Sequence, residues 1–350
     1  MGISLTKVGI IGATGYTGLE LLRCLLHHPE VEVTIATSRQ FVGKKVSALF
    51  PFLKEYNNLT LSPLDPDRIA KQTDIVFTAL PHQVSMEVVS FFIKKGKKVI
   101  DLSADFRLKD PTVYEAWYGP HKAKKLLALA VYGLPEIYSK KIKRASLVAN
   151  PGCYPTTVIL ALAPFLHHKR IIALDNIIID AKSGVSGAGR GAKLATHFCE
   201  VNENIEAYKM CIHRHTPEIE QELTQLAGEE VKVIFVPHLI PISRGMFTTV
   251  YTRLIKPITS ETAHTLMTDY YRNKPFIELL PPETAPKTIY VRGTNICQLG
   301  VKVDKKSQSM VIMAAIDNLA KGASTQAIQN MNLMLALPEE MGLKTLSVFP

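Results

Sequence analysis

The chain has 350 residues, 47% of them hydrophobic, so it is long enough for about two domains with sizeable cores. Its formal net charge is +10, but aromatic residues do not interleave with the scattered basic ones, which argues against a nucleic-acid-binding surface. The five cysteines form no Cys-x-x-Cys pair and no apolar run approaches the roughly 18 residues of a membrane span. We therefore expect no disulfide framework, no structural zinc and no membrane span, and a cytoplasmic location.

Over the first 150 residues, short apolar runs typical of buried parallel strands alternate with helical patterns. The strand-like runs occupy residues 7–11, 31–37, 73–80, 97–102 and 146–150. Helical patterns follow the first and third runs, at residues 19–29 and 84–96. This alternation predicts an α/β fold with a doubly wound parallel sheet of the Rossmann type.

After residue 150 the strand-like runs have fewer helices between them, which predicts a second, α+β domain with a mostly antiparallel or mixed sheet. These runs occupy residues 176–184, 231–237, 246–255, 296–304 and 309–317. The stretch from residue 321 to 337 has a helical pattern. We expect residues 1–150, with a returning C-terminal segment at about 318–350, to form the Rossmann domain and residues 151–317 the second domain.

Three glycines lie between the first strand and the first helix, in the sequence GATGYTG at residues 12–18. Glycines in this context allow a sharp turn and bring backbone N–H groups against a phosphate at the helix start, as in dinucleotide-binding loops. The alternative is a tight turn with no ligand. We expect a dinucleotide to bind at Gly12, Thr14, Gly15, Tyr16, Thr17 and Gly18.

The end of the second strand favours NADP over NAD. An NAD site usually has Asp or Glu there to bind the ribose hydroxyls, whereas this chain has Ser38 and Arg39. A serine hydroxyl and a guanidinium can both bind a 2′-phosphate, which a carboxylate would repel. The alternative for Arg39 is a surface cation with no ligand.

The segment ANPGCYPTTV at residues 149–158 places Cys153 after a Pro-Gly turn and at the start of a helical pattern. The N–H groups and dipole of a helix N-terminus stabilise a thiolate and can also bind an oxyanion. Cys153 is therefore a candidate nucleophile. The alternative is a buried apolar cysteine, which is how we interpret Cys24 within its leucine-rich helix.

Two histidines in the segment HRHTPEIEQEL are candidate acid/base partners for this cysteine. His213 and His215 precede a predicted helix with Thr216 as its N-cap and Pro217 as its first residue. The positive helix end favours neutral imidazole, which suits a general base. A metal site is the weaker alternative, because no third ligand lies nearby in the sequence.

Further candidate anion contacts lie in polar segments that follow strands. DLSADFR ends at Arg107, where open sheets bind ligands. A loop rich in Gly and Ser, at residues 181–193, can hold an anion through amides and hydroxyls, and the alternative is a mobile surface loop. The basic residues in these segments are Lys182, Arg190 and Lys193, with Arg244 farther along beside a glycine.

Taken together and in order, these motifs resemble the N-acetyl-gamma-glutamyl-phosphate reductases, within the superfamily of aspartate-semialdehyde dehydrogenases. The resemblance covers nearly the whole chain. It rests on GATGYTG, DLSADFR, VYGLPE, NPGCYPT, AKSGVSGAGR, HRHTPEI, PHLIPISRG and the terminal segment with QNMN. One departure is Ser324-Thr325, where the family pattern has Ala-Gly, and we expect local repacking there.

The resemblance implies a Rossmann domain, a substrate and dimerisation domain, NADP as cofactor and a homodimer or homotetramer. It implies reduction of N-acetyl-L-glutamyl 5-phosphate to the 5-semialdehyde, a step of arginine biosynthesis. It further implies a thioacyl intermediate on Cys153, with His215 as the acid/base and His213 nearer the substrate. Further implied residues are Ser183, Gly184 and Asn318 for the cofactor, and Arg107, Asn150, Lys182 and Arg244 for the substrate. The alternatives are a reductase of a protected aminoadipyl phosphate or of aspartyl phosphate, and a non-catalytic NADP-sensing regulator.

Overall fold

The computed structural model describes residues 5–167 and 171–349, so residues 1–4 and 350 of the predicted Rossmann domain and residues 168–170 of the predicted second domain lie outside it. The chain divides into two compact units. One comprises Met1–Pro151 and Ala323–Lys344, and the other Gly152–Gly322 and Thr345–Pro350. Among the described residues, no helix is long and apolar enough to cross a membrane.

The first unit is built on a six-stranded sheet in which every pair is parallel, with the order β2-β1-β3-β4-β6-β5. The predicted doubly wound parallel sheet is therefore confirmed. The inner strands are almost entirely buried, as expected for apolar runs of a parallel sheet with helices on its faces. The strands are β1 (Thr6–Ile11), β2 (Val31–Ala36), β3 (Ile75–Thr78), β4 (Lys98–Asp101), β5 (Val131–Tyr132) and β6 (Leu147–Ala149).

Helices of the first unit begin where the sequence offers good caps. Asp65 and Asp110 each accept a backbone N–H of the first turn of the helix that follows, and a proline is the first residue of both helices. The helical segments are α1 (Tyr16–Leu25), α2 (Val46–Leu49), η1 (Pro51–Tyr56), α3 (Pro66–Gln72), α4 (Ser85–Lys94), α5 (Pro111–Tyr118), η2 (Lys124–Leu126), α6 (Pro135–Ile142) and α12 (Thr325–Met334).

The C-terminal helix α12 belongs to this first unit, where it packs against α1, α6 and β4. Its polar side chains are buried and hydrogen-bonded: the Asn330 amide, for example, donates to the carbonyl of Gly133 at 2.8 Å. Just before α12, the Ser324 hydroxyl donates to the carbonyl of Thr17 at 2.9 Å. The departure from the family pattern at Ser324 thus adds a hydrogen bond to the glycine-loop helix.

The second unit contains a mixed seven-stranded sheet with the order β11-β12-β13-β10-β7-β9-β8, as predicted for an α+β domain. The pairs β7–β9 and β11–β12 are parallel and the others antiparallel. The strands are β7 (Ile177–Gly184), β8 (Glu206–Ala207), β9 (Val233–Ile240), β10 (Met246–Arg253), β11 (Ile277–Leu279), β12 (Cys297–Asp304) and β13 (Ser309–Ile316).

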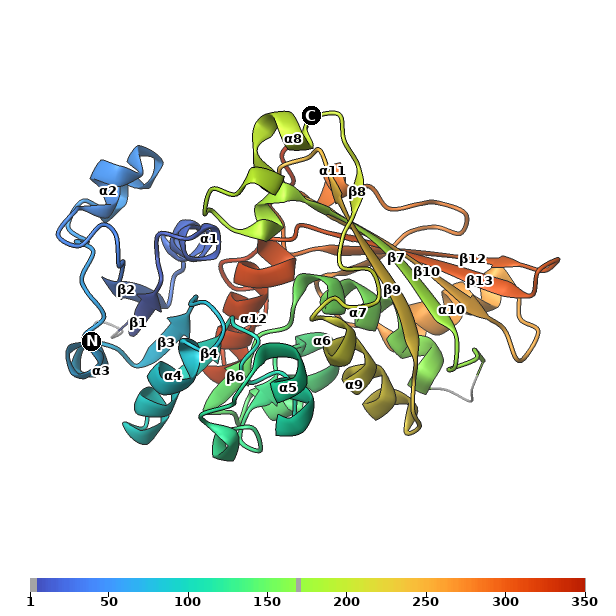
Figure 1. Cartoon of the computed structure of the whole chain (residues 1–350), viewed down its shortest axis with the longest axis horizontal. Coiled ribbons are helices and arrows are strands. Elements are labelled where there is room, and N and C mark those ends of the chain that lie inside the picture. The colour runs from blue at the N-terminus through green and yellow to red at the C-terminus, as the bar shows by residue number, and fades with distance from the viewer. Residues whose placement is uncertain (1–4, 168–170, 350) are drawn as a thin grey trace. The chain divides into compact units, whose positions relative to one another are not determined.

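Helix α7 (Cys153–His167) is the central helix of this unit and packs against β10, β13, α9 and α10 (Figure 1). It is apolar on all sides and buried from Tyr154 to Leu166, as expected of a helix surrounded by protein. The remaining helical segments are η3 (Val185–Ala188), η4 (Leu194–Thr196), α8 (Phe198–Val201), α9 (Thr216–Ala227), α10 (Ser260–Tyr270), α11 (Thr288–Val291) and the π-helix η5 (Ala320–Ser324).

Candidate functional site

The three glycines of the loop between β1 and α1 are required for different reasons. Gly12 has φ +88°, and a Cβ atom added there would lie 2.4 Å from the carbonyl oxygen of Ala79. A Cβ at Gly18 would lie 2.4 Å from the carbonyl oxygen of Gly12. At Gly15, however, the nearest described atom, the Gly12 oxygen, would be 3.8 Å away. The fold itself therefore requires Gly12 and Gly18, whereas the open space at Gly15 fits the close approach of a ligand phosphate.

We expect Gly15→Ala to leave folding unchanged but to weaken NADPH binding by about 10-fold or more, because the added methyl group occupies the space that a pyrophosphate needs at the start of α1. Gly12→Ala is the contrast, because its strained backbone and its clash should lower the thermal unfolding temperature. Titration of NADPH by fluorescence, with melting curves for both variants, checks this. Wild-type affinity in Gly15→Ala would contradict a dinucleotide site here.

The predicted NADP residues lie beside this loop. The Ser38 hydroxyl is 3.1 Å from that of Thr14, so the end of β2 contacts the glycine loop. Ser38 is buried and its hydroxyl also accepts the N–H groups of Gln40 and Phe41, at 3.3 and 3.2 Å. Arg39 is exposed. The serine therefore shapes the turn, and the arginine is the accessible group.

Arg107 and Asn150 are joined to one another in the first unit, at the carboxyl ends of β4 and β6. The buried Arg107 donates from Nε to the carbonyl oxygen of Asn150 at 2.8 Å and from Nη2 to that of Leu102 at 3.1 Å. The Asn150 amide donates to the carbonyl of Ala323 and accepts from Asn330. Both residues are thus held at the ligand-binding edge of the sheet.

In the second unit, α7 begins at Cys153 itself, so the cysteine lies at a helix start as the sequence predicted. The turn before it is held by two bonds at Gly152: its N–H donates to a carboxylate oxygen of Glu218 at 2.8 Å, and its carbonyl accepts from Thr156 N–H at 3.0 Å. Gly322 packs against the cysteine, since a Cβ there would lie 2.8 Å from the Cβ of Cys153. The contacts of Glu218 with Gly152 and of Gly322 with Cys153 could not be predicted from the sequence, because they join segments far apart in the chain.

A cavity of about 410 Å³ opens beside Cys153 and brings together the residues of three predicted segments. Cys153, both histidines and the loop after β7 all line it. Its other walls combine small and apolar residues with charged and aromatic ones. The lining residues are Cys153, Tyr154, Ser183, Gly184, Gly187, Ala188, Lys193, Ala195, Thr196, Glu206, Tyr208, Lys209, His213, His215 and Leu239.

The two histidines lie next to each other, with ring centroids 4.8 Å apart. Burial, together with the cations of Lys209 and Arg214, lowers the pKa of His213 to about 4. Thr216 was predicted as the N-cap of α9, but it is the first helical residue, and His215 occupies the cap position. The Thr216 N–H instead donates to the carbonyl of His213 at 2.9 Å.

Lys182 does not line this cavity, although Ser183 beside it does. Successive side chains of a strand point to opposite faces of the sheet, so Lys182 shares a face of β7 with Asp180, to which it is ion-paired. His238 on the neighbouring strand also contacts Asp180, at 3.2 Å. Arg190 is exposed in the loop after β7.

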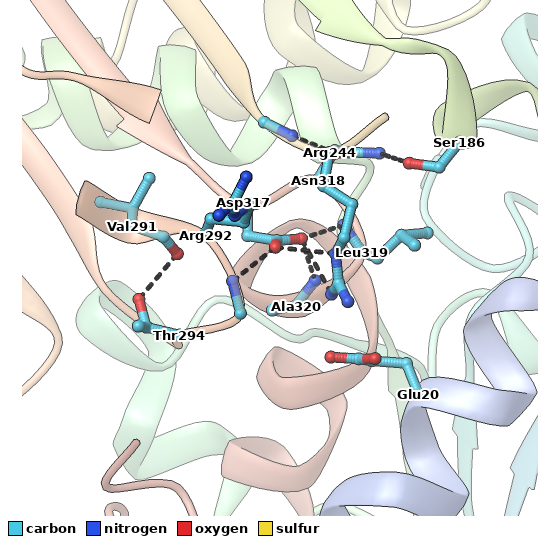
Figure 2. A network of polar contacts seen from close by, with 12 residues as sticks. Glu20, Ser186, Arg244, Val291, Arg292, Thr294, Asp317, Asn318, Leu319 and Ala320 are labelled. Carbon is cyan, nitrogen blue, oxygen red and sulfur yellow. Dashed lines mark hydrogen bonds and ion pairs between the residues drawn. The ribbon is translucent and has the colours of Figure 1, made fainter. Parts of the chain in front are cut away.

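Arg244 and Asn318 belong to a polar network around Asp317, which Figure 2 shows at its centre. Asp317 is fully buried and accepts a hydrogen bond from Arg244 Nη2 at 3.2 Å, while Arg244 Nε lies 2.9 Å from it as an ion pair. Asp317 also accepts from three backbone N–H groups, those of Gly293, Leu319 and Ala320. Asn318 accepts from Gly245 N–H at 2.8 Å and donates to the Ser186 hydroxyl at 2.9 Å. Asn318 thus anchors the loop that lines the cavity, and the charge of Arg244 is matched by Asp317.

In the described part of the chain, no three His, Cys, Asp or Glu side chains group as metal ligands. The second unit offers a cysteine at a helix start beside two adjacent histidines, and the first unit offers a glycine loop of the dinucleotide-binding kind. Groups of these kinds are used in acyl transfer and in hydride transfer.

Two family models cover most of the chain. The semialdehyde dehydrogenase NAD-binding domain matches residues 7–145, and the semialdehyde dehydrogenase dimerisation domain matches residues 153–318. Solved aspartate semialdehyde dehydrogenases share the fold. Enzyme II from Vibrio cholerae, complexed with ASA, has a TM-score of 0.73 at 19% sequence identity. The Candida albicans enzyme with NADP has a TM-score of 0.70 at 17% sequence identity. Each comparison covers 95% of this chain and 99% of the other. The chain is thus an oxidoreductase of the semialdehyde dehydrogenase class.

Within this class, much closer relatives exist. The N-acetyl-gamma-glutamyl-phosphate reductase of Geobacter sulfurreducens is 53% identical over 345 residues, and that of Pelotomaculum thermopropionicum 52%. Each alignment covers 98% of this chain and 99% of the relative. The chain belongs to the N-acetyl-gamma-glutamyl-phosphate reductase family.

Proposed function

We propose that this enzyme reduces N-acetyl-L-glutamyl 5-phosphate to N-acetyl-L-glutamate 5-semialdehyde with NADPH, releasing inorganic phosphate, as a step of arginine biosynthesis. The observation that supports this most is the cavity in which Cys153, at the first position of α7, lies with His213 and His215. The full-length similarity to reductases of that name supplies the substrate. A sensor that only bound a dinucleotide would have no need of this arrangement.

Cys153 acts as the nucleophile. Its position at the N-terminus of α7 places it next to N–H groups that lack partners within the helix and at the positive end of the helix dipole. Both favour the thiolate, which is the reactive form. The same N–H groups can stabilise the oxyanion that forms when sulfur adds to the acyl carbon.

The reaction proceeds in two stages. The sulfur of Cys153 attacks the γ-carbonyl carbon, a C–S bond forms, and the C–O bond to phosphate breaks with its electron pair leaving on phosphate. Bound NADPH supplies the hydride for the resulting thioester. His215 donates a proton to the oxyanion of the resulting thiohemiacetal and takes it back as that intermediate collapses, when the C–S bond breaks and Cys153 leaves as thiolate.

Three features support NADPH over NADH. Arg39 is exposed beside the loop and can bind a 2′-phosphate, Ser38 lies against Thr14, and neither position bears the carboxylate that a ribose-binding NAD site uses. The open space at Gly15 fits the pyrophosphate. Ser183 and Gly184, in the wall of the cysteine cavity, are the proposed contacts of the nicotinamide end.

Arg107 and Asn150 remain our proposed substrate contacts in the first unit. We assign no substrate contact to Lys182, which pairs with Asp180 on the other face of β7, and we assign Arg244 to holding its loop, because Asp317 pairs with it. For the oligomer, the uncovered face of the second sheet is the proposed contact with a second copy. It exposes Ile178, Ile234 and Tyr251 by 39–43% within the region that matches a dimerisation domain.

The deciding experiment is the reverse reaction: reduction of NADP⁺ by N-acetylglutamate 5-semialdehyde, with and without inorganic phosphate. We expect turnover that requires phosphate and is at least about 10-fold more efficient with NADP⁺ than with NAD⁺, since a charge-assisted phosphate contact contributes roughly 1.5–3 kcal/mol. Aspartate semialdehyde and a protected aminoadipate semialdehyde are the control substrates. Turnover with a control substrate alone would overturn the substrate, and NADPH binding without turnover on any of them would indicate a sensor.

A further inference from the structure

Resting on the proposed function, we infer that His213 is a positioning residue: its neutral ring caps the N-terminus of α9 and thereby fixes His215, which alone carries the proton. The two histidines therefore have unequal roles, although they lie side by side in one cavity. The inference rests on two hydrogen bonds, on the rings packed around His213 and on the charges near it.

The hydrogen bonds come from the first residues of α9. The Nδ1 atom of His213 accepts the backbone N–H of His215 at 3.1 Å, and the carbonyl oxygen of His213 accepts the N–H of Thr216 at 2.9 Å. The first N–H groups of a helix lack partners within it. His213 thus satisfies two of these donors, as a capping Asn or Ser does when its side-chain oxygen accepts an N–H two residues farther on. His215, at the cap position, forms no such side-chain cap.

The hydrogen bond from the N–H of His215 to Nδ1 of His213 determines the protonation state of the His213 ring. A nitrogen that accepts an N–H cannot carry a proton itself, so Nδ1 is bare and a neutral ring has its proton on Nε2. Protonating Nδ1 would place two donors against each other and break the cap. His213 can therefore cap α9 only while its ring is neutral.

The surroundings of His213 keep it neutral. Four rings pack around it, those of Tyr154, Tyr208, His215 and Phe235, with centroids between 4.8 and 5.6 Å away. Burial raises the pKa of Tyr208 to about 12 and that of Tyr154 farther still, so both phenols are uncharged near neutral pH.

The charged groups nearby act in the same direction. The cations of Lys209 and Arg214 oppose a positive charge on the ring, and burial opposes it further, which accounts for the low pKa of His213. A general base works best with a pKa near the working pH, so His213 is unsuited to proton transfer. This leaves His215, which it holds in place, for that role.

Three variants test the assignment. His213→Asn keeps a side-chain acceptor that can reach the N–H of His215, His213→Leu keeps bulk but has no acceptor, and His215→Asn removes the proposed proton carrier. We expect His213→Asn to keep kcat within about 5-fold of wild type with the acidic limb of its pH profile unmoved. His213→Leu should lose about 100-fold, the scale expected when a catalytic group is displaced by about 1 Å. Its melting temperature should also fall, by about 2–4 °C, for loss of a cap.

Two results would overturn the inference. One is a folded His213→Asn enzyme as inactive as His215→Asn, or with a shifted acidic limb, because the ring of His213 would then transfer the proton. The other is a His213→Leu enzyme with wild-type kcat and melting temperature, because the cap would then do nothing. A wild-type enzyme without turnover would instead contradict the proposed function, and the melting temperatures of the two His213 variants would still decide whether His213 caps α9.

Discussion

Cys153→Ala should abolish turnover, by at least about 10³-fold in kcat, the scale seen when a covalent nucleophile is removed. The alanine side chain cannot form the thioester, so no stage of the reaction after substrate binding can proceed. The fold should be unchanged, because Cys153 is only partly buried at the first position of α7 and alanine is a good helix former. Phosphate-dependent reduction of NADP⁺ by N-acetylglutamate 5-semialdehyde measures the loss.

The controls separate chemistry from structure. Cys199→Ala, an exposed cysteine of α8, should keep wild-type rates. NADPH affinity should be close to that of the wild type in both alanine variants, because alanine is smaller than cysteine and neither position is a proposed cofactor contact. If Cys153→Ala retains a rate within 10-fold of wild type, the thioacyl mechanism is wrong.

The second large effect is expected at His215, where His215→Asn should lower kcat by about 10²–10⁴-fold, the usual range for a general acid/base. Asparagine can form hydrogen bonds but cannot transfer protons near neutral pH. The variant should have a lower kcat but unchanged NADPH affinity. Iodoacetamide should still alkylate Cys153, because α7 is unchanged. Pre-steady-state measurement of phosphate release against aldehyde formation would locate the affected stage.

His27→Asn is the matched control, because His27 is exposed just beyond the end of α1 and far along the chain from the cavity residues. It should have wild-type kcat. A mild effect at His215 together with a severe loss in His213→Asn would exchange the roles of the two histidines. The low pKa of His213, about 4, makes that exchange unfavourable, because its ring is then neutral near neutral pH.

Most of the fold could be predicted from the sequence because its strongest signals are local. Strand-like runs such as residues 7–11 and 73–80 correspond to β1 and β3, and each run of the second half corresponds to a strand of the mixed sheet. The edge strands β5, β8 and β11 were missed. They have only two or three residues each, which is too short for any hydrophobic period to appear.

Those residues of the candidate site that are identified by the residues next to them in the chain could be predicted from the sequence. The glycines before α1, the cysteine that begins α7 and the histidines before α9 each had a turn and a helix start to identify them. The N-cap of α9 was wrong by one residue, since the cap of a helix depends on the backbone angles of the junction and not on residue type alone.

The sequence by itself thus determined the two-domain α/β class, the glycine loop and the candidate nucleophile, because periodicity and turn chemistry act over a few residues. Tertiary structure alone decided which long-range partners support them: Glu218 at Gly152, Gly322 against Cys153, and Asp317 on Arg244. It also decided that the cavity lies on the face of β7 that bears Ser183 and not on the face that bears Lys182. Such contacts join segments tens of residues apart, and only packing of the whole unit brings them within hydrogen-bond distance.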